Sequence, residues 1–67
     1  MDETWIKIYT STDFYKAEIV RQVLIDHEIE AVLMNKQDTS YKFGEVHVNI
    51  PSIHFQKASE IISQNDL

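Results

Sequence analysis

Apolar and polar residues alternate strictly over residues 45–50, EVHVNI. An alternation with a period of two is typical of a strand that buries one face and exposes the other. Pro51 follows directly and lacks the N–H that a central strand would need, so it marks the end of this strand. The pattern predicts a core face with Val46, Val48 and Ile50, and an outer face with Glu45, His47 and Asn49.

Residues 5–10, WIKIYT, predict another strand because they are rich in β-branched and aromatic side chains. The same alternation places Ile6 and Ile8 on the core face. Residues 29–35, IEAVLMN, form a further short apolar run of strand length. The outer face of residues 5–10 is expected to carry Trp5, Lys7 and Tyr9.

Two helices are expected between and after these strands. Residues 11–13 (Ser, Thr, Asp) are all good N-cap residues, and residues 14–28 then show helical spacing. A second helix is expected after Ser52. The first helix should bury Ala17, Val20, Val23, Leu24 and His27, and the second Phe55, Ala58, Ile61 and Ile62.

The elements follow one another as β-α-β-β-α in a single domain, residues 1–67. A strand, a crossover helix and a parallel strand form a right-handed unit, and the hairpin that follows adds an antiparallel strand. We therefore expect an α+β, ferredoxin-like fold whose three strands lie in the order 1-3-2, with both helices on one face. The first strand then has an unpaired outer edge, and the sheet has one face without helices.

Four segments resemble the small bacterial DUF2007 domains, which are regarded as signal-transducing proteins with a fold like that of the PII (GlnB-like) regulators. The segments are KIYTSTDFYKAEIVRQVLIDHEI, EAVLMN, VHVNIP and KASEII, and they lie within a core of about residues 5–62. The chain departs from the family at Glu28, where a glycine is usual. That glycine suits a left-handed helix C-cap, which glutamate adopts at a cost of about 1 kcal/mol.

The composition narrows the classes of function. The chain has no cysteine, which excludes disulfides and thiolate metal sites and fits a cytoplasmic protein. Its net charge is −5 and Arg21 is its only arginine, so the basic surface that binds nucleic acid or an anionic membrane is missing. The N-terminus lacks the features of a signal peptide, and no apolar run approaches the length of a membrane span.

Two surfaces are candidates for binding a partner. One is the open sheet face, where exposed aromatic side chains need an explanation. The other is the loop of residues 36–44, which is longer than an ordinary hairpin loop. In PII regulators the corresponding loop contacts targets and helps to bind nucleotide, but this loop has one glycine and no phosphate cradle. The predicted binding residues are Trp5, Tyr9, His47 and Asn49 on the face, and Tyr41, Lys42 and Phe43 in the loop.

No catalytic signature is recognisable, and a chain this short can hardly enclose a cleft that would tune a catalytic pair. We expect no enzyme activity, no cofactor and no metal site, since Asn49 beside His47 is a poor transition-metal ligand. The favoured interpretation is a regulatory module that binds a protein partner or itself. The alternative is a sensor domain for a small ligand such as a nucleotide or metabolite.

Overall fold

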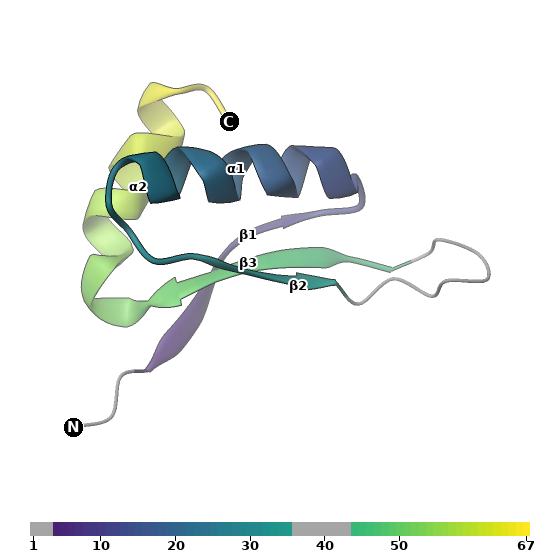
Figure 1. Ribbon diagram of the computed structural model, residues 1–67, viewed down its shortest axis with the longest axis horizontal. Helices are drawn as coiled ribbons and strands as arrows, with labels where there is room; N and C mark the ends of the chain where they lie inside the picture. The colour runs from purple at the N-terminus through teal and green to yellow at the C-terminus, as the bar shows by residue number, and fades with distance from the viewer. Residues whose placement is uncertain (1–3, 36–43) are drawn as a thin grey trace.

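The computed structural model (Figure 1) describes residues 4–35 and 44–67. These residues form the predicted β-α-β-β-α order, with one short 3-10 turn before the last helix. None of the helices in these two ranges has the length and apolar character that a membrane crossing requires. The elements are β1 (Trp5–Ser11), α1 (Phe14–Asp26), β2 (Val32–Asn35), β3 (Val46–Pro51), η1 (Ser52–His54) and α2 (Phe55–Gln64).

The three strands form one sheet in the order β1-β3-β2, with β3 antiparallel to both neighbours. β1 and β2 therefore run parallel to each other, joined by α1, as the expected crossover requires. In Figure 1 both helices lie on the same side of the sheet. The predicted α+β, ferredoxin-like fold is confirmed, and within the described residues the outer edges of β1 and β2 have no strand partner.

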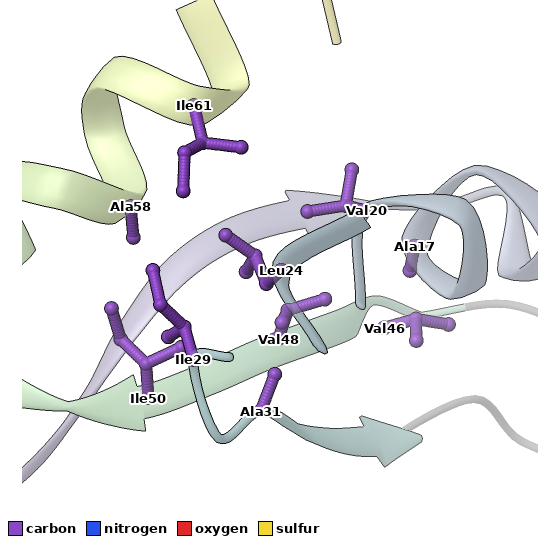
Figure 2. Packing of buried hydrophobic residues seen from close by; sticks show 10 residues of the cluster. All are labelled: Ala17, Val20, Leu24, Ile29, Ala31, Val46, Val48, Ile50, Ala58 and Ile61. Atoms are coloured by element: carbon purple, nitrogen blue, oxygen red, sulfur yellow. The ribbon is translucent and has the colours of Figure 1, made fainter. Parts of the chain in front are cut away.

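The core lies between the helices and the sheet (Figure 2). Its buried members are all apolar, and no polar or charged residue of the described ranges is buried. Burying each larger aliphatic side chain contributes about 1.5–3 kcal/mol, so a core of this size must be closely packed to hold a small domain together. The buried apolar residues are Ala17, Val20, Leu24, Ile29, Ala31, Val46, Val48, Ile50, Ala58 and Ile61.

A bulge interrupts β1 and changes which way its second half faces. Lys7 is paired with Asn49, but the next pair is Tyr9 with Val48, so Ile8 is an extra residue. One extra residue moves every following side chain to the opposite face. Tyr9 consequently packs against the core, and Thr10 takes the outward position beside His47. The prediction that Tyr9 points to the open face is wrong.

The ends of α1 are fixed by specific hydrogen bonds. Asp13 is the N-cap, and its Oδ1 accepts from the Tyr15 backbone N–H at 2.9 Å, as the run of cap residues predicted. At the other end Glu28 has a φ of 65°. Its N–H donates to the Ile25 carbonyl, and the Ile29 N–H donates to the Leu24 carbonyl, both at 2.9 Å. This is a Schellman motif, and Glu28 occupies the left-handed position that glycine normally takes.

Three predicted details are wrong near the other elements. The second strand begins at Val32 and not at residue 29, because the Schellman turn and the buried Ile29 and Ala31 lie between α1 and β2. Ser52 does not cap α2, since it lies in η1 and its N–H donates to the Thr4 carbonyl. The 3-10 turn rotates the start of α2, so Phe55 is 52% exposed where helical spacing predicted burial.

Candidate functional site

The face of the sheet opposite the helices is the candidate site, and we call it the open face. The strand register defines it as two rows across the three strands. In one row Asn49 of β3 lies between Lys7 of β1 and Val32 of β2. In the next row His47 of β3 lies between Thr10 of β1 and Met34 of β2. Its described residues are Trp5, Lys7, Thr10, Val32, Met34, His47 and Asn49.

Apolar side chains stand exposed on both outer strands of this face. Trp5 on β1 is 38% exposed, and on β2 Val32 and Met34 are 42% and 40% exposed. Their positions follow from the alternation of each strand, since Ile6 and Leu33 on the other side pack against the core. The β2 flank of this face is therefore apolar, while the β1 flank combines Trp5 with the polar Lys7 and Thr10, and the central strand is polar.

The His47 imidazole lies in a polar row on this surface. Its Nδ1 is 3.2 Å from the Thr10 hydroxyl oxygen, and its Nε2 is 3.7 Å from a Glu45 carboxylate oxygen. Thr10 reaches His47 only because the bulge turns it outward. The Thr10 hydroxyl at Nδ1 and the Glu45 carboxylate near Nε2 fix the orientation of the ring.

Asn49 lies in the centre of the next row, between Lys7 and Val32. Its side-chain oxygen is buried and accepts no hydrogen bond from the described residues. A buried acceptor without a donor is unusual in a folded protein. Asn49 therefore offers hydrogen-bonding capacity that the described part of the chain leaves unused.

Comparison with known proteins identifies the family of this chain. The family model DUF2007, "Putative prokaryotic signal transducing protein", matches residues 5–66. The chain belongs to the DUF2007 family. Neither the curated proteins nor the solved structures contain a significant match. The match covers β1 through the end of α2, and so it includes the whole sheet and the open face.

The DUF2007 domain brings together some of the predicted binding residues but not all. Trp5, His47 and Asn49 lie on the open face, while Tyr9 lies on the helix side. Thr10 was missed because nothing in the strand's composition signals the bulge. The loop residues Tyr41, Lys42 and Phe43 lie outside the described residues.

The shifted ionisable groups of this DUF2007 domain lie away from the open face. On α1 the Arg21 guanidinium donates to both Glu18 carboxylate oxygens, and the Gln22 amide donates to one of them. These hydrogen bonds lower the pKa of Glu18 from 4.5 to about 2 and raise that of Arg21. Among residues 4–35 and 44–67 there is no group of three histidine or acidic side chains that could hold a metal ion.

Proposed function

We propose that this DUF2007 domain is a non-enzymatic regulatory module of the cytoplasm that binds a protein partner, or a second copy of itself, through the open face. The family description, signal transduction, fits a module of this kind. The loop of residues 36–44 adjoins this sheet in sequence and is included in the proposed contact surface, with Tyr41, Lys42 and Phe43 as its candidate residues.

The observation that carries this proposal is the exposure of Trp5, Val32 and Met34 on a face that no helix covers. Large aromatic and methionine side chains are enriched at the centres of protein interfaces, and their exposure on a small soluble protein commonly marks an interaction site. The polar side chains of Lys7, Thr10 and His47 on the same face supply groups that would fix the register of a partner.

A protein partner fits the charge of this face better than a nucleic acid does. Sheet faces that bind RNA combine aromatic side chains with basic ones that neutralise phosphates. The only basic side chain in the two rows, apart from the His47 imidazole, is Lys7, and the whole chain carries a net charge of −5. Unchanged Trp5 fluorescence upon addition of single-stranded RNA at low salt is the expected result.

The test is the molar mass in solution, measured by light scattering over a concentration series. The informative variant is the double change Trp5→Ser and Met34→Ser, which removes apolar surface from both flanks of the open face. The matched control is Tyr15→Ser, because Tyr15 is 76% exposed but lies on α1, on the other side of the sheet.

If the chain binds itself through this face, the wild type and Tyr15→Ser should associate alike while the double variant remains monomeric. Far-UV circular dichroism should show that all three proteins keep the same fold. Association that survives the double change would place the self-contact elsewhere. A wild type that stays monomeric at every concentration would overturn self-association through this face.

A further inference from the structure

A pocket of about 220 Å³ lies on the helix side of the sheet, remote from the open face. It is open to solvent on one side and is lined by residues of β1, α1 and the turn that follows α2, and Figure 1 shows this last turn returning over α1. The lining combines apolar side chains with one cation, one carboxylate and one phenol. The lining residues are Tyr9, Lys16, Ile19, Val20, Asp66 and Leu67.

Two backbone irregularities converge on this pocket. The bulge at Ile8 turns Tyr9 from the open face toward the helices, which makes it a wall of the pocket. Asp66 has a φ of 57° and its N–H donates to the Ser63 carbonyl at 3.2 Å, as in the Schellman motif that ends a helix. The Leu67 backbone N–H donates to the Ile62 carbonyl at 3.1 Å. Bulges are common next to functional sites, because they aim side chains that a regular strand would point elsewhere.

The two charged groups of the pocket are not used in the fold. In the described ranges the ion pairs are Arg21 with Glu18 and His47 with Glu45, so neither Lys16 nor Asp66 has an opposite charge within 4 Å. The lining side chains of Ile19, Val20 and Leu67 are apolar. The lining therefore complements a molecule that carries both signs of charge and an apolar group.

The volume sets the size of that molecule. A dry cavity of about 150 Å³ admits benzene, and sites for drug-sized ligands begin at about 300 Å³. A pocket of about 220 Å³ falls between these limits and is too small for a nucleotide. We propose that it binds a free apolar α-amino acid of the size of leucine or phenylalanine. The ligand carboxylate meets Lys16, its ammonium group meets Asp66, and its side chain lies against Ile19, Val20 and Leu67.

This site is independent of the proposed function, because the pocket and the open face lie on opposite sides of the sheet. Loss of association through Trp5 and Met34 would leave amino-acid binding intact, and loss of amino-acid binding would leave association intact. Each proposal can therefore fail without the other.

The first experiment titrates the full chain with L-leucine by calorimetry and by two-dimensional NMR. Saturable binding is expected, with shift changes concentrated at the backbone amides of Tyr9, Ile19, Val20 and Leu67. The two single-charge analogues of leucine are 4-methylpentanoate, which lacks the ammonium group, and 3-methylbutylamine, which lacks the carboxylate. Both should bind at least about tenfold more weakly, since a hydrogen bond to a charged group contributes about 1.5–3 kcal/mol.

The second experiment repeats the titration with Lys16→Gln and Asp66→Asn. Asparagine tolerates the left-handed backbone of residue 66, so the second change removes the charge and keeps the turn. Each variant should raise the Kd for L-leucine about tenfold, and Lys57→Gln, an exposed lysine on α2, should leave it unchanged. The proposal is overturned if neither leucine nor phenylalanine binds saturably, or if both charge variants bind like the wild type.

Discussion

Glu28 is the residue whose replacement most directly tests how the sequence fixes the fold. It occupies the left-handed position of the Schellman motif at the end of α1, with a φ of 65°. The motif cannot relax, because it joins Leu24 to Ile29, and both side chains are almost fully buried. A β-carbon in this conformation costs about 1–2 kcal/mol, and this cost must be present in the folded protein.

Glu28→Gly should therefore stabilise the domain. Glycine removes the steric cost but loses about 0.5–1 kcal/mol through the greater freedom of the unfolded chain. The difference is a net gain of about 0.5–1 kcal/mol. For a domain of this size 1 kcal/mol shifts the Tm by about 4–8 °C, so the Tm should rise by roughly 2–8 °C.

The assay is reversible thermal and urea unfolding followed by far-UV circular dichroism. Glu28→Ala is the matched control, because it removes the same carboxylate near the negative end of the helix dipole but keeps the β-carbon. The glycine variant should exceed the alanine variant in stability, with an unchanged dependence on urea. A glycine variant no more stable than the alanine variant would refute the assignment of a backbone cost to this position.

Two smaller predictions concern the other features of α1. The pKa of Glu18 lies below its ordinary value, so its ion pair with Arg21 stabilises the folded state above about pH 4.5, and this contribution is lost as the pH falls toward 2. Glu18→Gln should therefore lose less stability than the wild type between these two pH values, and parallel curves would show that the pair contributes nothing. Asp13→Ala removes the N-cap acceptor of α1 and should lower the free energy of unfolding by about 0.5–2 kcal/mol. An equal loss in Asp13→Asn, which keeps an acceptor, would point to charge instead of capping.

The regular parts of this fold could be predicted from its sequence because each follows from a single period. The alternation of residues 45–50 gives the two faces of β3, and the 3.6-residue stripe of α1 gives Ala17, Val20 and Leu24 as core. The left-handed turn at Glu28 was also foreseeable, from the residue that the family usually has there.

The wrong predictions lie where a bulge or a 3-10 turn interrupts the regular period of a strand or helix. The bulge at Ile8 reverses Tyr9 and Thr10, and a bulge leaves no mark in a run of β-branched and aromatic residues. The 3-10 turn before α2 likewise leaves Phe55 exposed, although helical spacing alone predicted that it is buried. Both errors bear on function: the first removed Tyr9 from the open face and placed it in the pocket on the helix side.

The central claim is that the open face is where this DUF2007 domain meets a protein. Site-specific photo-cross-linking in living cells tests it most directly, with p-benzoylphenylalanine placed in turn at position 34 on the open face and at position 15 on α1. The account predicts a discrete cross-linked product from position 34, either with another protein or with a second copy, which disappears when Trp5→Ser is added. Equal cross-linking from both positions, or none from position 34, would contradict it.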